Sequence, residues 1–342
     1  RGGERRTQDR IVKFFQDELN YEYLGNWEER TNNGNIEEEL LSKYLKGKYS
    51  QTLINKAVNQ LQKLATNQSK SLYDINKEIY SALRYGIDVK DKAGDKKQTI
   101  QFINWNEPLK NNFYIAEEVT VAGVNEKRPD IVLYVNGIAL GVLELKRSKV
   151  SVSEGIRQNL DNQRPEFIQN FFGTIQLIMA GNDSEGLRYG VIETPEKYFL
   201  NWKEQTGIRN KLDSGLSVLC EKQRFMELIH DFIVFDRGQK KIARHNQFFA
   251  VKESQSKLKK REGGIIWHTQ GSGKTLTMVW LAKWIRENIH DSRVLLITDR
   301  EELDDQIEER FHGIDEAIYR TKSGKDLINK LDKAEPWLIC SL

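Results

Sequence analysis

A glycine-rich stretch in the last third of the chain has the residue types and spacing of a nucleotide-phosphate site. Residues 268–275 read HTQGSGKT. Glycines let a backbone curl until its N–H groups face phosphate oxygens. Lys274 can reach the β and γ phosphates, and the Thr275 hydroxyl can hold Mg²⁺. The sequence therefore predicts a site for ATP and Mg²⁺, with contacts from Gly271, Ser272, Gly273, Lys274 and Thr275.

His268 departs from the usual pattern of such loops, G-x-x-x-x-G-K-S/T, because it stands where the first glycine belongs. A glycine-rich turn with an incidental lysine is the alternative interpretation. The flanking sequence favours the phosphate loop. Ile265–Trp267 is a short apolar run that predicts a buried parallel strand, and the apolar residues from Leu276 onward have helical spacing. Val294–Ile297 predicts the next buried strand, so the whole stretch predicts a βαβ unit.

A second group of residues, Asp130, Glu144 and Lys146, has the spacing P-D-x13-E-x-K. Residues two apart in a strand share a face, so Glu144 and Lys146 should point the same way. Charged groups in so apolar a run are costly to bury without partners. Two carboxylates, a backbone carbonyl (expected from Leu145) and waters could bind Mg²⁺. The metal could lower the pKa of a water and stabilise charge on a phosphodiester, with help from Lys146.

A structural ion pair at the end of a hairpin would give the same E-x-K spacing. The turn Asn136-Gly137 between two β-rich runs predicts that hairpin. A strict two-residue turn would pair Asp130 with Leu143, which would turn Asp130 away from Glu144. The catalytic interpretation therefore predicts a bulge, a longer turn, or an Asp130 that lies just before the strand.

These motifs resemble those of a known family. HTQGSGKT, followed by TDREELDDQ at 298–306, resembles the first motor motifs of superfamily-two helicases. It is most similar to the motor (R) subunit of type I restriction endonucleases, where a histidine also opens the loop. RHNQFFAV at 244–251 is similar to the segment before that loop, and the resemblance implies that Gln247 contacts adenine. RPDIVLYVNGIALGVLELKRS at 128–148 resembles the PD-(D/E)xK nuclease core at the amino end of these subunits.

The resemblance extends to residues outside the two motifs. Gln158 matches a glutamine that is followed four residues later by a tyrosine in those nucleases, but Asn162 stands at the tyrosine position. Glu4 matches an acid of the opening helix that faces the nuclease metal. An exposed helix residue is the alternative for both Gln158 and Glu4. The resemblance thus implies catalytic roles for Asp130, Glu144, Lys146 and Gln158, and metal contacts from Asp130, Glu144 and Glu4.

The surrounding sequence predicts an α/β protein. Periodic apolar residues predict a helix over 4–19, two or three helices over 36–85, and a helical stretch over 204–236, while strands are expected from Phe113 onward. We expect a restriction-endonuclease-like mixed sheet flanked by helices, followed by a partial RecA-like parallel α/β motor domain. The expected domains are residues 1–236, a PD-(D/E)xK nuclease domain with a helical insertion, and residues 237–342, the truncated N-terminal part of the first RecA-like helicase/translocase domain.

Composition narrows the class of protein. The net charge of +3 over 342 residues is too small to argue for nucleic-acid binding by itself. No apolar stretch approaches the roughly 20 residues needed to cross a bilayer, so no membrane is expected as a partner. The two cysteines, Cys220 and Cys340, lie far apart in the sequence and form neither a disulfide framework nor a zinc motif. This cysteine usage favours a cytoplasmic location.

The resemblance implies an R subunit of a type I restriction-modification enzyme. Such a subunit cuts double-stranded DNA with Mg²⁺, couples cleavage to ATP-driven translocation, and works with methyltransferase and specificity subunits. A DNA repair nuclease–helicase, or a nucleotide-gated DNA-binding or scaffold protein with an inactive nuclease site, are the alternatives. A motor also needs an acidic pair that holds Mg²⁺. The last residues, Trp337–Leu342, are typical of the strand before that pair, so we expect this chain to bind nucleotide weakly without hydrolysing it.

Overall fold

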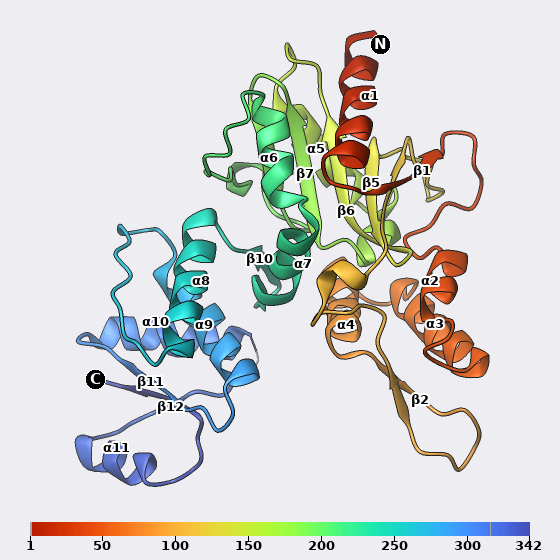
Figure 1. The fold of residues 1–342 in the computed structure, drawn as a ribbon. Coiled ribbons are helices and arrows are strands. Elements are labelled where there is room, and N and C mark those ends of the chain that lie inside the picture. Colours follow the sequence, from red (N-terminus) through yellow and green to blue (C-terminus); the bar gives the residue numbers. More distant parts are fainter. Residues whose placement is uncertain (1, 315) are drawn as a thin grey trace. The chain divides into compact units, whose positions relative to one another are not determined.

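The computed structural model describes residues 2–314 and 316–342, with side chains from Arg5 onward (Figure 1). The chain forms two compact units. The first runs to His230 and includes residues 238–242, and the second comprises residues 231–237 and 243–342. Within the described residues, no helix is both long enough and apolar enough to span a membrane.

The first unit is built on a mixed sheet with the strand order β1-β4-β5-β6-β7-β8 (Figure 1). The pairs β1/β4 and β6/β7 are parallel, and the other neighbouring pairs are antiparallel. Every residue of β5 and β6 is buried, which explains why these strands read as continuous apolar runs. The strands are β1 (Glu22–Asn26), β4 (Phe113–Glu117), β5 (Ile131–Val135), β6 (Ile138–Leu145), β7 (Leu177–Asn182) and β8 (Gly186–Gly190).

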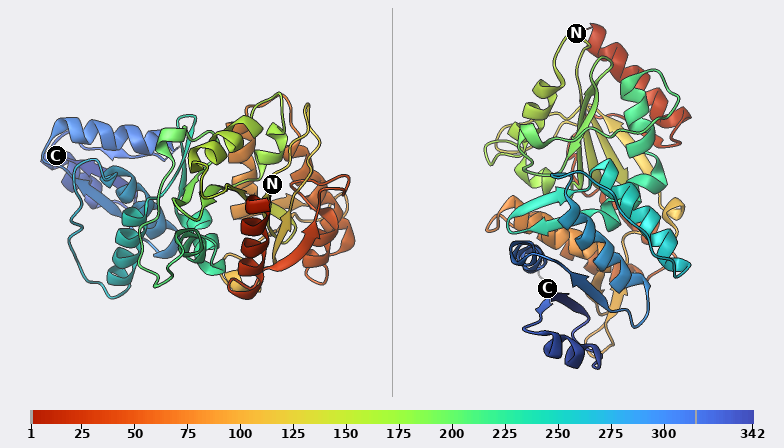
Figure 2. Two further views of the ribbon diagram at one scale, coloured as in Figure 1. Left: turned by 90° about the horizontal axis from the view of Figure 1, so that it is seen from above. Right: turned by 90° about the vertical axis from the view of Figure 1, so that its left-hand side faces the viewer.

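Helices cover both faces of this sheet. Helix α5 (Val152–Asn162) packs through Gly155 against Ala180 of β7, whereas Leu212 of α6 (Lys211–Leu219) lies against the next residue, Gly181. Successive strand residues point to opposite faces, so α5 and α6 lie on opposite sides. In the right-hand view of Figure 2, α1 (Gly2–Asp17) lies on the α6 side. The predicted opening helix is confirmed.

The two or three helices that the sequence predicted over residues 36–85 are confirmed. Ser50, Ser71 and Ser151 each precede a helix, and each side chain accepts a hydrogen bond from a backbone N–H in the first turn. The remaining elements of this unit are α2 (Glu38–Leu45), α3 (Gln51–Ala65), α4 (Leu72–Tyr85), β2 (Ile87–Val89), β3 (Gln98–Ile100), η1 (Pro108–Lys110), η2 (Gln169–Gly173), η3 (Glu196–Tyr198), α7 (Lys222–Asp231) and β10 (Gln239–Ile242).

The second unit contains a parallel sheet with the order β11-β13-β12. The chain thus combines a mixed sheet flanked by helices with a parallel α/β sheet, as predicted. The elements of this unit are β9 (Ile233–Asp236), α8 (His245–Lys259), α9 (Lys274–Asn288), β11 (Val294–Ile297), α10 (Glu301–Gly313), β12 (Tyr319–Arg320), α11 (Gly324–Leu331) and β13 (Leu338–Ser341).

The prediction of a strand at Ile265–Trp267 is wrong. This segment has no regular structure, and the exposed fractions of Ile265 and Trp267 are both 90%. Within the described part of the chain, no strand pairs with it. An apolar run without a neighbouring strand leaves its backbone groups to water, and three side chains alone cannot hold it extended. Val294–Ile297 does form the predicted strand β11, but it is partly exposed rather than buried.

Candidate active site

A β-bulge at Leu140 turns Asp130 and Glu144 to the same face of the first sheet. The pairing of β5 with β6 shifts by one residue between Leu133 and Tyr134, which leaves Leu140 as the extra residue. Beyond the bulge, the register places Asp130, which lies just before β5, opposite Glu144. Opposed residues of antiparallel strands share a face. The sequence required one of three arrangements, and the structure has two of them, the bulge and the position of Asp130 just before the strand.

The two carboxyls lie in very different surroundings. Glu144 is fully buried, and neither carboxylate oxygen accepts a hydrogen bond from any residue that the structure describes. Asp130 is half-buried, and its Oδ2 accepts a hydrogen bond from the backbone N–H of Leu145 at 2.7 Å. No local pattern in the sequence predicts this bond, because it depends on the register after the bulge.

Burial raises the pKa values of both carboxyls. Burial raises the pKa of Glu144 well above its usual range, and the charge of Asp130 raises it further, while Lys146 lowers it. Burial likewise raises the pKa of Asp130 to about 6, against the opposing effect of the Leu145 N–H. When one carboxyl is protonated, it can donate a hydrogen bond to the other, so the pair titrates as one unit.

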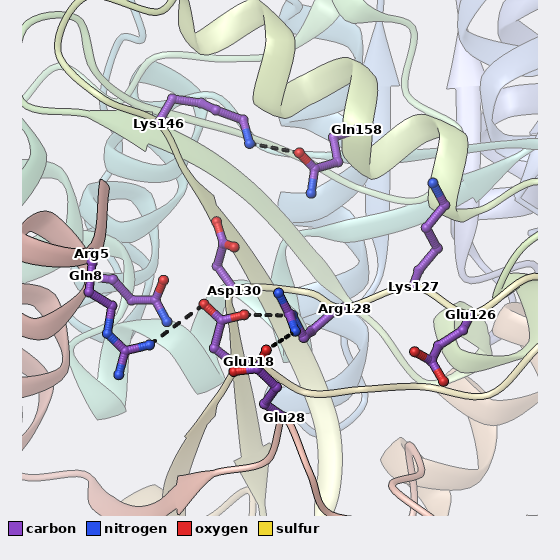
Figure 3. A pocket seen from close by; sticks show the side chains of 10 residues that line it. All are labelled: Arg5, Gln8, Glu28, Glu118, Glu126, Lys127, Arg128, Asp130, Lys146 and Gln158. Atoms are coloured by element: carbon purple, nitrogen blue, oxygen red, sulfur yellow. Dashed lines mark hydrogen bonds and ion pairs between the residues drawn. The ribbon is translucent and has the colours of Figure 1, made fainter. Parts of the chain in front are cut away.

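Lys146 bridges the strand and helix α5. Its Nζ lies 3.9 Å from Oε2 of Glu144 and donates a hydrogen bond of 2.6 Å to Oε1 of Gln158 (Figure 3). The structure therefore brings together Asp130, Glu144, Lys146 and Gln158. Asn162 is buried one turn after Gln158, and its side-chain amide has no hydrogen-bond partner among the described residues.

Asp130, Lys146 and Gln158 line a pocket of about 940 Å³ (Figure 3). The sequence motifs did not point to Arg128 and Glu118. Nε of Arg128 lies 2.7 Å from Oε2 of Glu118, and both side chains lie below Asp130 in Figure 3. The position of Arg128 directly before the P-D pair could have indicated that it lies at the site. No sequence pattern around Glu118 indicates a place at the site. The remaining lining residues are Arg5, Gln8, Glu28, Glu126 and Lys127.

Glu117, the last residue of β4, ties helix α1 to the sheet beside this pocket. Its carboxylate accepts hydrogen bonds from Nε2 of Gln8 at 2.9 Å and from the hydroxyl of Tyr23 at 2.6 Å. The opening of α1 also carries Glu4, whose side chain lies outside the described residues. Its metal contact stays a prediction.

The residues present fit a hard divalent cation. The two buried oxygens of Glu144 lack hydrogen-bond donors and face a second carboxylate, which is an unfavourable arrangement unless a proton or a cation joins them. Across the side chains that the structure describes, no three His, Cys, Asp or Glu residues gather as a metal site. A metal would therefore depend on Asp130 and Glu144 together with backbone oxygens and water.

The predicted phosphate loop lies in the second unit, at the start of α9. Gly271 and Gly273 adopt positive φ values of 77° and 85°, where an L side chain would be strained. Nζ of Lys274 donates to the carbonyls of His268 and Thr269 at 3.2 and 3.1 Å, so the lysine folds back on its own loop. A phosphate group would offer this ammonium stronger acceptors than these carbonyls.

Three side chains at the start of α8 hold the loop backbone. Nη1 of Arg244 donates to the carbonyl of Gly271 at 3.0 Å, and Nδ2 of Asn246 donates to that of Ser272 at 3.3 Å. Nε2 of Gln247 donates to the next carbonyl, of Gly273, at 2.9 Å.

The other end of the Gln247 amide is engaged as well, because Oε1 accepts the N–H of Arg244 at 2.8 Å. A contact from Gln247 to adenine would require an exchange of partners, and it stays a prediction.

Replacing Gln247 with alanine is expected to weaken nucleotide binding about tenfold, because the loss of one hydrogen bond of about 1–1.5 kcal/mol frees the loop. Titration with a fluorescent ATP analogue measures the affinity. Gln255→Ala is the matched control, since Gln255 is also buried on α8 but does not contact the loop. Equal affinities of Gln247→Ala and the unmodified chain would contradict this role.

Comparison with known proteins gives the family. Residues 3–197 match the family described as the type I restriction enzyme R protein N terminus, which covers more than half of the chain. The chain belongs to this family of type I restriction enzyme R proteins. Residues 246–342 match the SWI2/SNF2 ATPase family, so the predicted relationship to a restriction and motor subunit is confirmed.

Several relatives are named as endonuclease subunits of type I restriction enzymes. The HindI subunit of Haemophilus influenzae is 27% identical over 317 residues, which covers 83% of this chain and 28% of the relative. The MjaIXP subunit of Methanocaldococcus jannaschii is 26% identical over 318 residues, which covers 81% of this chain and 30% of the relative. The SauCOLORF180P subunit of Staphylococcus aureus is 25% identical over 252 residues, which covers 71% of this chain and 27% of the relative. The chain thus spans less than a third of the length of these relatives.

Proposed function

We propose that this chain contains the nuclease and the start of the motor of a type I restriction enzyme R subunit. In this proposal residues 1–236 cleave double-stranded DNA with Mg²⁺, and residues 237–342 bind ATP as part of a DNA translocase. The observation that supports the nuclease assignment most is the bulge at Leu140, because its register sets Asp130 opposite the buried Glu144, beside a pocket that Asp130 and Lys146 line.

Each residue of the nuclease group has a distinct task. Asp130 and Glu144 would hold the divalent cation, which supplies positive charge and an acidified water when it is bound. Lys146 carries a positive charge toward the pocket, where it can orient a water or stabilise the negative charge that develops on a phosphodiester. Gln158 holds the Lys146 ammonium through the bond of 2.6 Å.

The motor assignment depends on the phosphate loop and on the match to the ATPase family. Gly271–Thr275 would bind the nucleotide phosphates with Mg²⁺, and Lys274 would exchange its loop carbonyls for phosphate oxygens. Because the relatives are subunits of multisubunit restriction enzymes, we propose methyltransferase and specificity subunits as partners, a cytoplasmic location, and cleavage coupled to ATP-driven translocation.

Titration of Mn²⁺ by calorimetry, in the presence of short duplex DNA, tests the nuclease site. We expect Asp130→Ala to lower the affinity at least about tenfold, since one of two carboxylate ligands is lost. Glu126→Ala is the matched control, because this exposed carboxylate lines the same pocket without contacting the other carboxyls. Equal binding by Asp130→Ala and the unmodified chain would contradict the proposed metal site.

A further inference from the structure

Helix α5 approaches the strands most closely at Gly155, directly over the proposed nuclease group. A Cβ atom added at Gly155 would lie 3.1 Å from Cβ of Ala180, 3.5 Å from Cβ of Glu144 and 3.5 Å from Cγ of Lys146. Glu144 and Ala180 are themselves paired neighbours on β6 and β7. The helix therefore lies on this pair so closely that a methyl group at Gly155 would press on Ala180, while it would reach Glu144 and Lys146 at ordinary van der Waals distances.

Glycine lowers helix stability relative to alanine, so its place inside α5 calls for a reason. The fold does not require an unusual backbone there, because Gly155 is not among the residues with positive φ. The contacts indicate that the reason is the close approach of α5 to β6 and β7 at this residue. Gln158 lies three residues later on the same helix face, and it holds the Lys146 ammonium at 2.6 Å.

We propose that Gly155 is a positioning residue for the nuclease, a role that rests on the function proposed above. The missing side chain lets α5 lie close enough to β6 for Gln158 to hold Lys146 beside Glu144. An alanine at position 155 would press on Ala180 at 3.1 Å, so α5 would have to move outward by a few tenths of an ångström, and the hydrogen bond between Gln158 and Lys146 would lengthen. Displacements well under 1 Å at such a group are sufficient to slow a reaction.

The first test measures the chemical reactivity of Lys146 in the absence of metal and of DNA cleavage. In EDTA, acetic anhydride labels lysines at rates that mass spectrometry resolves residue by residue. We expect Gly155→Ala to raise the labelling rate of Lys146 several-fold relative to that of Lys127, which lines the same pocket but does not contact α5 through Gly155. An unchanged rate for Lys146 would overturn the positioning role, whether or not the chain cuts DNA.

The second test measures cleavage of plasmid DNA with Mn²⁺. We expect Gly155→Ala to lower kcat about 10- to 100-fold with an unchanged KM for DNA. Adding Ala180→Gly removes the closest contact, so the double variant should recover most of the rate when compared with Ala180→Gly alone. Ala180→Val adds bulk from the strand side and should reproduce both effects if Gly155→Ala does not fold.

Gly215→Ala is the control for a purely structural effect. Gly215 lies on α6, on the opposite face of the sheet, and a Cβ there would lie 2.7 Å from Cβ of Leu187. This variant should lower the thermal stability yet leave kcat and the labelling of Lys146 unchanged. No recovery in the double variant would overturn the inference about Gly155. A wild-type chain that neither binds Mn²⁺ nor cuts DNA would overturn the nuclease function instead.

Discussion

Replacing Lys146 with methionine is expected to lower the rate of DNA cleavage by about 10²–10³-fold, because it removes the positive charge that faces the pocket. Methionine retains the apolar stem, so the packing against α5 and β6 should remain. Affinity for Mn²⁺ should stay the same or increase, since the ammonium 3.9 Å from Glu144 no longer competes with the metal. Nicking of supercoiled plasmid and calorimetry measure the two effects.

Lys127→Met is the matched control for this prediction. Lys127 lines the same pocket, but its ammonium lies over the ring of Phe167, 4.1 Å from the ring centre. Its removal should change DNA affinity slightly, through one fewer positive charge, and leave the chemical step unaffected. Cleavage by Lys146→Met at the wild-type rate would show that Lys146 is a structural partner of Glu144 and Gln158 only.

Replacing Glu144 with glutamine is expected to stabilise the metal-free protein at pH 8 by about 1–3 kcal/mol. At this pH the wild-type chain must either bury a carboxylate whose oxygens receive no hydrogen bond among the described residues or take up a proton from a solution poor in protons, and both cost free energy. The glutamine amide is neutral and can donate to Asp130. The same change should abolish Mn²⁺ binding and cleavage, so stability and function move in opposite directions.

The pH dependence of the free energy of unfolding is an independent test of whether this pair of carboxyls destabilises the folded chain. Both carboxyls have raised pKa values in the folded chain, that of Asp130 to about 6. The folded state therefore keeps protons that the unfolded chain loses near pH 4. The free energy of unfolding should be highest below pH 4 as far as this pair is concerned, and should fall as the pH rises through about 6. Glu144→Gln should flatten this decline.

Glu117→Gln is the control for the stabilising substitution. Glu117 is also a buried acid of the same sheet, but its carboxylate accepts hydrogen bonds from Gln8 and Tyr23. Its replacement should destabilise the protein, because it weakens two charge-assisted bonds. Chemical denaturation at pH 5 and pH 8 in EDTA measures both variants. A destabilised Glu144→Gln at pH 8 would mean that the carboxylate has an unseen partner.

Local patterns predicted much of the first unit correctly. The turn at Asn136-Gly137 and its flanking strands appear where the sequence predicted them, because a two-residue turn with positive φ values of 54° and 90° suits this dipeptide. The need for an irregularity (a bulge, a longer turn, or an Asp130 ahead of the strand) also followed from the sequence, since residue counting around the turn set Asp130 and Glu144 on opposite faces. Counting could not place the bulge at Leu140.

The sequence failed where a segment depends on distant neighbours. Ile265–Trp267 has the composition of a buried strand, but a strand forms only where another strand offers a ladder, and none does so among the described residues. The N–H of Leu145 that binds Asp130 also follows from pairing between strands. Such contacts join residues far apart in the chain, and no local pattern encodes them.

The sequence by itself determined the two chemical groups, their order along the chain and the family to which the chain belongs, because motif spacing and turn chemistry are local properties. Only the tertiary structure decided that Glu144 is buried without donors, that Gln158 holds Lys146, and that Gly155 of α5 lies against Ala180. These properties arise from the packing of α5 on β6 and β7, and packing depends on every element that the fold brings together.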